Sequence, residues 1–290
     1  MNFRRISARV AVAGVSTALA AGALVGITGA AANAETVVNT YTCSNAAVGI
    51  TKDFDLTVNG AIPVPQYWAG ASVPGGLLNI TASAPVDPET AALLGGAGVT
   101  GAKSDDFAFS LGSTSVPVPV AGDFTTTDGN TSWDASGSNE PFTTPNPGTY
   151  DAVMPTAFTM TLMQGDTPSI ALDCVIKDGT DPLAITTGFQ LLQQESGLVV
   201  PKTATAKVGK PAKLPVTLSS TSLGNPIAGA KVVAKEGSKT LATGKTAKSG
   251  KVTLDLGKKL KKGKHKITVS YSGTPSMKGS KGTTTLTVKK

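Results

Sequence analysis

Hydrophobic and polar residues alternate in short runs along most of the chain, and turn-forming residues separate these runs. In the first half the runs lie at 35–44, 54–58, 77–82, 106–111, 115–120, 157–163 and 170–177. Strands with one buried face alternate with period two, and Gly, Pro, Asn and Asp favour the turns between them. The pattern therefore predicts that 35–180 is a mostly β, sandwich-like domain.

One stretch of this half has the pattern of a helix instead. Asp87 is a favourable N-cap residue, Pro88 suits the first helical position, and Gly95 and Gly96 favour termination. We therefore expect one short helix here. The stretch 122–148 is rich in Thr, Ser, Asn, Gly and Pro, and we expect it to be a long exposed loop.

The last 90 residues have a more regular pattern. Seven candidate strands lie at 203–208, 213–219, 230–235, 239–243, 251–256, 265–271 and 283–289. This number and spacing suit an immunoglobulin-like (Ig-like) sandwich. In 264–271 the lysines occupy the outward phase, whereas His265 shares the inward phase with Ile267 and Val269. We expect His265, the only histidine of the chain, to be a half-buried structural residue.

Several motifs of the chain resemble known families. Gly209-Lys-Pro-Ala-Lys-Leu-Pro-Val-Thr-Leu218 and Gly263-Lys-His-Lys-Ile-Thr-Val-Ser-Tyr-Ser-Gly273 resemble the bacterial Ig-like repeat domain, over about residues 203–290. This resemblance implies a structural or binding module rather than an enzyme. Tyr41-Thr42-Cys43 and a later Cys-containing strand resemble an uncharacterised β-rich domain of secreted actinobacterial proteins, over about 35–180. That family implies no activity.

The start of the chain has the features of an export signal. Three arginines precede an uncharged apolar run over 10–32, and Ala32-Asn33-Ala34 fits a signal-peptidase site. A retained membrane anchor is the alternative, because the run is long enough to span a bilayer. We expect a signal peptide at 1–34, an acidic domain at 35–180, a linker at 181–202 and a basic domain at 203–290. After signal removal we expect no transmembrane anchor, and a protein that is extracellular or loosely associated with the cell surface.

The chain has two cysteines, Cys43 and Cys174, and each lies in a predicted strand. An even pair in an exported protein indicates a disulfide bond. A metal site is the alternative, but it requires more ligands than this sequence places nearby. We therefore predict a disulfide, with no metal and no cofactor.

The net charge differs sharply between the two halves. Residues 35–200 carry seventeen Asp and Glu and three Lys, whereas 201–290 carry twenty Lys and two acids. After residue 34 there is no arginine, the residue suited to bidentate phosphate recognition. We therefore expect salt-sensitive association with an anionic cell-wall polymer or polysaccharide and no sequence-specific nucleic-acid binding. The predicted polyanion-binding residues are Lys258, Lys259, Lys261, Lys262, Lys264 and Lys266. The alternative is docking of the oppositely charged halves, within one chain or head to tail between copies.

The acidic half offers weaker candidates for a site. Tyr67, Trp68 and Trp133 form a possible ligand platform. Asp53 and Asp55 would share one strand face. A paired-carboxylate glycosidase, which uses two acids on either side of the scissile bond, is therefore an alternative. An acidic stretch carries oxygen groups of the kind calcium binds, at Asp128, Asn130, Asp134, Ser136, Asn139 and Glu140. Solvated or core side chains explain these residues more simply. We expect a non-enzymatic binding protein, with a carbohydrate-binding or carbohydrate-processing protein as the runner-up.

Overall fold

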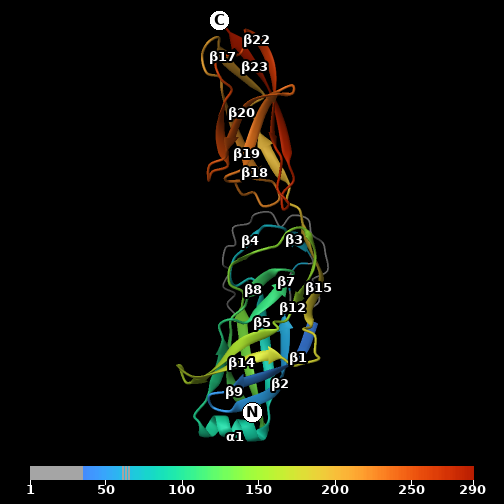
Figure 1. Cartoon of the computed structure of the whole chain (residues 1–290), viewed down its shortest axis with the longest axis vertical. Helices are drawn as coiled ribbons and strands as arrows, with labels where there is room; N and C mark the ends of the chain where they lie inside the picture. Colours follow the sequence, from blue (N-terminus) through green and yellow to red (C-terminus); the bar gives the residue numbers. More distant parts are fainter. Residues whose placement is uncertain (1–34, 61, 63, 65) are drawn as a thin grey trace, which may run out of the picture.

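The main sheet of the first half closes into a barrel (Figure 1). The computed structural model describes residues 35–290 except 61, 63 and 65; the predicted signal peptide therefore lies outside the described residues. The barrel strands are β1 (Glu35–Asn45), β2 (Ile50–Gly60), β5 (Asn79–Val86), β6 (Gly101–Ser104), β9 (Val120–Thr127), β10 (Asn130–Ser138), β13 (Ala157–Gln164) and β14 (Thr167–Ile176). Around the barrel their order is β1-β14-β13-β6-β9-β10-β5-β2.

Alternate side chains of these strands fill the barrel interior. Tyr41 on β1, Leu56 on β2, Trp133 on β10 and Phe158 on β13 are all buried. The ring centroids of Tyr41 and Phe158 lie 5.0 Å apart in an edge-to-face arrangement. The interior is therefore a packed core, as the period-two alternation requires.

The barrel closes where its first and last strands meet. β1 and β14 form four residue pairs, and one of these places Cys43 directly opposite Cys174. The two cysteines form a disulfide across a sequence separation of 131 residues. The predicted disulfide is confirmed. It links β1 and β14, the two paired barrel strands that are farthest apart in sequence.

Smaller sheets and one helix complete the first domain. A five-stranded sheet contains β3 (Gln66–Trp68), β15 (Ala184–Leu192), β12 (Gly148–Val153), β7 (Ala108–Leu111) and β8 (Thr114–Pro117). A two-stranded sheet pairs β4 (Ser72–Val73) with β11 (Phe142–Thr143). The helix α1 (Pro88–Gly96) lies at the end of the barrel away from the second domain (Figure 1). Its N-cap Asp87 accepts a hydrogen bond from the Thr90 N–H at 2.9 Å, as the sequence predicts.

The prediction of a long exposed loop over 122–148 is wrong. Most of this range forms the β9–β10 hairpin, followed by β11. Trp133 and Ala135 face the core, whereas Ser132 and Asp134 face outward. Most outward positions carry Thr, Ser, Asn or Asp, so the composition resembles that of a loop. The side chains nevertheless alternate between buried and exposed, as they do in a strand.

The second half is a two-sheet sandwich. One sheet contains β16 (Ser196–Val199), β18 (Lys213–Ser220) and β21 (Lys251–Asp255). The other contains β17 (Thr203–Lys207), β23 (Ser280–Lys289), β22 (Gly263–Tyr271), β19 (Lys231–Glu236) and β20 (Lys239–Lys245). Leu218, Leu254, Ile267 and Leu286 are among the buried side chains between the sheets. We call 35–192 the barrel domain and 196–290 the sandwich domain.

Most of the predicted linker, 181–202, is paired β-structure. β15 pairs with β12 and β3 of the barrel domain, and β16 pairs with β18 of the sandwich domain. The buried side chain of Asn39 also accepts a hydrogen bond from Leu183 N–H and donates one to Asp181 O. Only 193–195 lie between the two strands, so the connection is far shorter than the sequence predicts.

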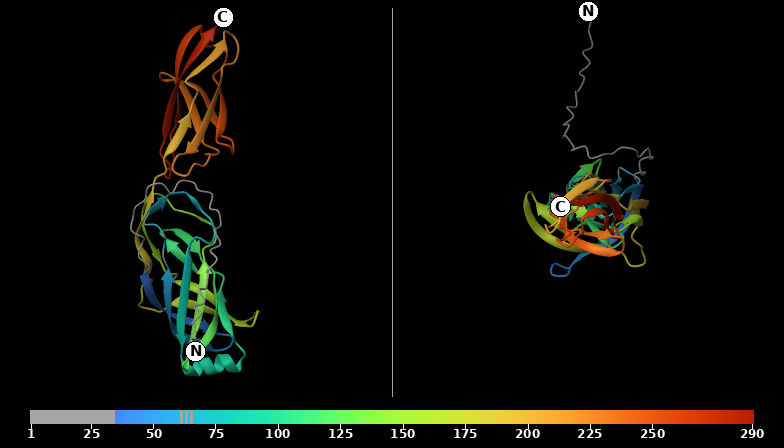
Figure 2. Two further views of the ribbon diagram at one scale, coloured as in Figure 1. Left: turned by 180° about the vertical axis from the view of Figure 1, so that it is seen from behind. Right: turned by 90° about the horizontal axis from the view of Figure 1, so that it is seen from above.

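The two domains lie end to end (Figures 1 and 2). Gln194 forms hydrogen bonds to both of them. Its side-chain Nε2 donates to Ala69 O of the barrel domain at 2.7 Å. Its Oε1 accepts from Ser220 Oγ of the sandwich domain at 2.9 Å. Its backbone N–H donates to Ser276 O, and its backbone O accepts from Lys278 N–H. Every polar group of this buried residue therefore holds the junction.

We expect that Gln194→Ala loosens this junction. The change leaves Ala69 O and Ser220 Oγ without their partner, at a cost of about 1–3 kcal/mol for each unsatisfied buried group. Small-angle scattering should then show a broader range of interdomain distances, while each domain keeps its own melting transition. Gln193→Ala is the matched control, because the Gln193 side chain is half-buried and its hydrogen bonds reach only the loop after β22. Identical scattering profiles for the two variants would contradict the role given to Gln194.

Candidate functional site

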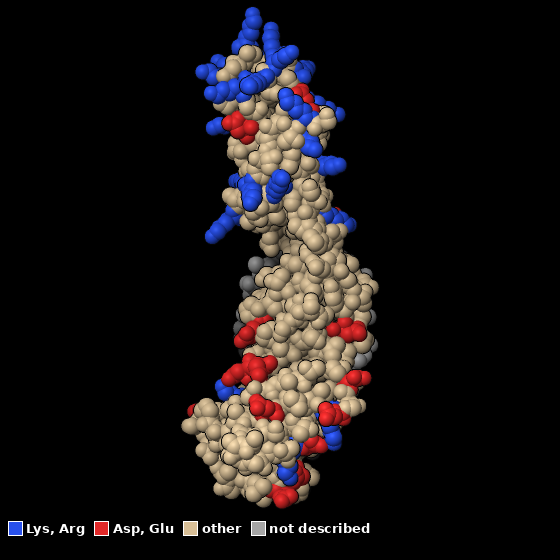
Figure 3. All heavy atoms as spheres, in the orientation of Figure 1, with Lys and Arg blue, Asp and Glu red and all other residues tan. Residues whose placement is uncertain are grey.

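Lysines gather at the end of the sandwich domain that lies farthest from the barrel domain, which we call the tip (Figure 3). Strand pairing places thirteen of the twenty sandwich-domain lysines at this end: Lys207, Lys210, Lys213, Lys235, Lys239, Lys258, Lys259, Lys261, Lys262, Lys264, Lys266, Lys289 and Lys290. All thirteen are exposed. The six predicted residues among them (Lys258, Lys259, Lys261, Lys262, Lys264 and Lys266), which we call the tip lysines, thus lie within a larger basic surface.

The segment 257–262, which we call the tip segment, carries four of the tip lysines. Leu260 is half-buried and packs against the sandwich core, whereas the lysines on either side of it are exposed. Gly257 N–H donates to Asp255 Oδ1 at 2.9 Å, and Gly257 O accepts from Ala212 N–H. The segment is therefore fixed at its start and its middle, and it presents ammonium groups to solvent.

His265 fixes the far end of the tip segment. Its Nε2 lies 2.7 Å from Lys261 O, and its Nδ1 lies 2.7 Å from Glu236 Oε1 on β19. A carbonyl and an ionised carboxylate both only accept, so both ring nitrogens donate when the imidazole is protonated. The hydrogen bond to Lys261 O, and next the one to Glu236, raise the pKa of His265 above its usual value.

The two carboxylates of the basic domain both serve the structure of the tip. Asp255 holds Gly257, and Glu236 holds His265. Among the described residues, Lys278 is the only lysine of 201–290 that forms an ion pair, and its partner is Glu195. The tip lysines are therefore available to an external anion, and the end-to-end arrangement keeps them away from the acidic domain (Figure 3).

The predicted aromatic platform does not form as the sequence suggests. Trp133 has an exposure of 2%, and its Nε1 donates to Ala102 O and Gly122 O inside the barrel domain. Tyr67 packs against the barrel core. Trp68 is half-buried on β3. Because Trp133 is a core residue, we correct the prediction that it joins Tyr67 and Trp68 in a ligand platform.

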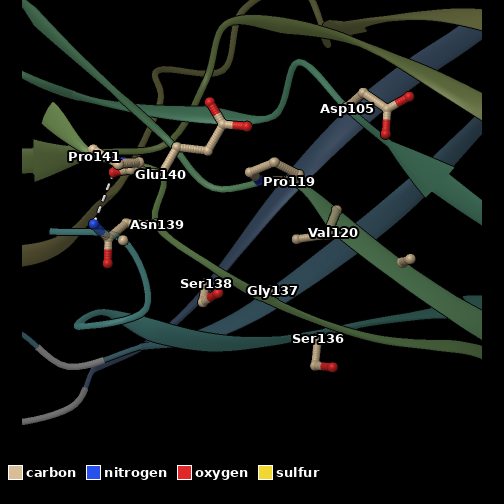
Figure 4. Close-up of a pocket in the computed structure, with 11 residues that line it drawn as sticks. Asp105, Pro119, Val120, Ser136, Gly137, Ser138, Asn139, Glu140 and Pro141 are labelled. Atoms are coloured by element: carbon tan, nitrogen blue, oxygen red, sulfur yellow. Dashed lines mark hydrogen bonds between the residues drawn. The ribbon is translucent and has the colours of Figure 1, made fainter.

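An open groove crosses the outside of the barrel domain (Figure 4). It has a volume of about 500 Å³, and Asp105 and Glu140 lie along one side of it, opposite Ser136 and Ser138. Asp105 already binds Lys103 Nζ at 2.7 Å. Within the described residues, no group of three or more His, Cys, Asp or Glu side chains is arranged to hold a metal ion.

The acidic stretch considered for calcium is spread along the hairpin and the turn after it. Asp134 lies within β10 and binds hydroxyl groups, whereas Asn139 is buried. The Asn139 Oδ1 accepts from Leu77 N–H and Leu78 N–H, and its Nδ2 donates to Pro74 O and Glu140 O. Asn139 therefore shapes the chain beside the groove. Sequence reasoning missed this role because three of its four partners are more than 60 residues away.

Several carboxylates of the barrel domain have lowered pKa values, because hydrogen bonds stabilise their ionised form. Hydrogen bonds from Lys177 and then Thr42 lower the pKa of Asp53. Hydroxyl donors on Thr125, Ser132 and Ser83 lower the pKa of Asp134. A general acid near neutral pH requires the opposite displacement. The candidate pair of Asp53 and Asp55 thus has a structural explanation, since Asp55 also accepts from Thr40.

We expect Asp134 to make barrel stability depend on acidity. Because its folded pKa lies below the unfolded value of about 3.9, its contribution is present above that pH and is lost as the pH falls through the folded pKa. Thermal melts followed by tryptophan fluorescence should show a steeper acid-side decline for the native chain than for Asp134→Asn. Asp178→Asn, which changes an exposed turn carboxylate, is the control. Equal acid-side slopes for the native chain and Asp134→Asn would contradict this role.

The comparison with protein families covers both domains. Residues 40–184, half of the chain, match the model of a family of unknown function (DUF6801). The chain belongs to this DUF6801 family. Residues 199–289 match the bacterial Ig-like domain (group 3), which confirms the predicted resemblance for the sandwich domain. The all-β fold with one short helix, a disulfide and a C-terminal Ig-like sandwich is thereby confirmed. The first domain, which the sequence predicts to be sandwich-like, contains a closed barrel instead.

Comparison with solved structures adds only distant likenesses. Fibronectin(III)-like modules of Clostridium thermocellum CbhA share 15% identity, with 80% of this chain and 94% of that one covered and a TM-score of 0.26. Three N-terminal domains of the bacteriophage RB49 outer capsid protein Hoc share 13% identity, with 86% and 59% covered and a TM-score of 0.27. A Ca²⁺-stabilized adhesin that helps an Antarctic bacterium reach out and bind ice shares 10% identity, with 90% and 92% covered and a TM-score of 0.26. No curated protein matches the chain.

The Ig-like match sets the broad class of the DUF6801 chain. Ig-like domains are typically non-catalytic, and the match supports a surface or binding protein. A bacterial Ig-like domain and a disulfide are also compatible with an extracellular location. Within the part of the chain that the structure describes, no helix has the length and apolar character to cross a bilayer.

Proposed function

We propose that the Ig-like domain of this DUF6801 protein holds the chain on an anionic polymer of the cell envelope. One observation carries the proposal: thirteen exposed lysines lie at the tip, and both nearby carboxylates are engaged in its structure. Lysine is a compact point charge on a flexible stem, so this surface suits a flexible polyanion better than a ligand of fixed geometry. The barrel domain then projects from the anchored tip.

Salt dependence tests this function. The protein from residue 35 onward should co-sediment with purified bacterial cell walls at low salt and release steeply as salt increases, because binding frees the counterions of the polymer. Walls stripped of anionic polymers should retain much less protein. If the protein stays in solution at about 20 mM salt, or binds stripped walls equally well, the proposal is wrong.

Carbohydrate recognition by the barrel domain is the second candidate, and the groove beside Asp105 and Glu140 favours it. The carboxylates of the groove could accept hydrogen bonds from sugar hydroxyls, and its serine hydroxyls could both donate and accept them. Binding to an array of neutral glycans discriminates the two functions, because lysines alone do not retain an uncharged sugar. Retention that is lost in Glu140→Ala and kept in a variant without the tip lysines would favour this second function.

A further inference from the structure

The His265 contacts tie the lysine surface to one titrating side chain. Lys261 O is a backbone group of the tip segment, and Glu236 belongs to the neighbouring strand β19. The imidazolium ring is therefore a bridge between the tip segment and the sheet. When the ring loses one proton it retains a single N–H, so one of its two acceptors must lose its hydrogen bond.

The remaining supports of the tip segment leave its end dependent on this bridge. Asp255 and Ala212 hold Gly257 at the start, and Leu260 packs on the core in the middle. Lys261 is the residue held by His265, and Gly263 follows with a φ of 143°, a conformation that favours glycine. Loss of the His265 contact would therefore free Lys261 and Lys262, the end of the tip segment that directly precedes β22.

We propose that His265 is a proton-operated clamp on the tip segment, so that the tip binds a polyanion more tightly at acidic than at alkaline pH. This inference rests on the proposed envelope-binding function and adds its regulation. A bound polyanion also favours the extra positive charge of the imidazolium, so binding and proton uptake assist each other, as thermodynamic linkage requires.

The charged groups around His265 are one carboxylate and several lysines. Glu236 is the acid, on β19. The lysines on the strands and segments that pack there are Lys235, Lys239, Lys261, Lys262, Lys264, Lys266 and Lys289. Free lysines disfavour protonation of the ring, whereas lysines neutralised by a polyanion do not. The pKa of His265 should therefore rise when the tip is occupied.

The chain has one histidine, so its imidazole gives a single set of NMR signals in the whole protein. We would titrate the protein, from residue 35 onward, with and without inorganic polyphosphate. The free protein should titrate above the usual histidine value of about 6.5. The pKa of His265 is higher in the folded than in the unfolded protein, so the protonated ring stabilises the fold. This stabilisation is fully present below the unfolded pKa of about 6.5, and it is lost as the pH rises through the folded pKa. Polyphosphate should raise the measured pKa by about 0.5, which corresponds to about a threefold loss of affinity between about pH 6 and about pH 9.

Two substitutions separate the clamp from general charge. His265→Gln should flatten the pH dependence of polyphosphate binding. Glu236→Gln keeps the imidazole visible and should lower its measured pKa, which provides a second test if His265→Gln fails to fold. Lys248→Gln, which removes one exposed positive charge from another part of the sandwich domain, should keep the native pH profile.

The outcomes distinguish the two proposals. Salt-sensitive binding that does not change with pH, or a histidine pKa at or below about 6.5, overturns the clamp and leaves the envelope function standing. Absence of polyphosphate binding at low salt at every pH overturns both. A raised pKa that increases further with polyphosphate, together with a flat profile in His265→Gln, supports the clamp.

Discussion

Replacing the six tip lysines with glutamine should lower the affinity for a linear polyanion by about 10²–10³-fold at about 0.1 M salt. The lysines at 258, 259, 261, 262, 264 and 266 are exposed and close in sequence at the tip, so they can contact the same stretch of polymer. For a single-stranded polyanion, each lost contact reduces the slope of log affinity against log salt by about 0.7. We therefore expect the slope to fall by up to about 4, measured by titration with polyphosphate at several salt concentrations.

The control is a second variant that loses the same number of positive charges from lysines outside the tip. Lys202, Lys231, Lys245, Lys248, Lys251 and Lys281 are all exposed and lie outside the tip. Their replacement with glutamine removes the same six charges, and we expect the affinity to fall less than about tenfold. If both variants lose affinity equally, net charge rather than the tip surface is responsible, and the site assignment is wrong.

Removing the disulfide should destabilise the barrel domain by about 3–5 kcal/mol. Cys43 and Cys174 lie opposite each other where β1 meets β14, and the bridge spans 131 residues of sequence. In the chain-entropy model a loop of this length contributes about 4–5 kcal/mol, and loss of a native disulfide typically costs about 2–5 kcal/mol. Alanine at both positions keeps the buried sites apolar, since each cysteine is nearly inaccessible.

The two domains can be followed separately in this experiment. The only tryptophans, Trp68 and Trp133, both lie in the barrel domain, so their fluorescence reports its urea unfolding. The His265 NMR signals report the sandwich domain in the same sample. We expect the tryptophan transition of the double alanine variant to move to lower urea, while the histidine transition stays in place. An unchanged tryptophan transition would contradict the stapling role of the bridge.

The local features of the fold were predictable because nearby residues determine them. The helix at Pro88–Gly96 follows from its Asp87 cap, and the outward lysines of β22 follow from period-two alternation. The pairing of Cys43 with Cys174 was predictable because the chain contains only these two cysteines. The tip lysines were predictable for a similar reason, since 258–266 is the densest lysine run of the sequence.

Features that depend on distant pairing were not predictable. Closure of the barrel requires β1 to meet β14, and no local pattern specifies that pairing. The stretch around Trp133 was predicted to be an exposed loop because its neighbours Ser132 and Asp134 are polar. These neighbours occupy the outer face of the strand, whereas Trp133 occupies the inner face. The clamp at His265 depends on Glu236, which is 29 residues away and adjacent only through β19–β22 pairing.

Lysine footprinting tests the central claim most directly, because every lysine reports its own accessibility. The protein from residue 35 onward would be acetylated at low reagent excess with and without a glycerol-phosphate polymer, and each site would be measured by mass spectrometry. We predict strong protection of the six tip lysines and little change at Lys231, Lys245, Lys248, Lys251 and Lys281, with all protection removed by high salt. Equal protection across both groups, or protection confined to the second group, would contradict binding through the tip.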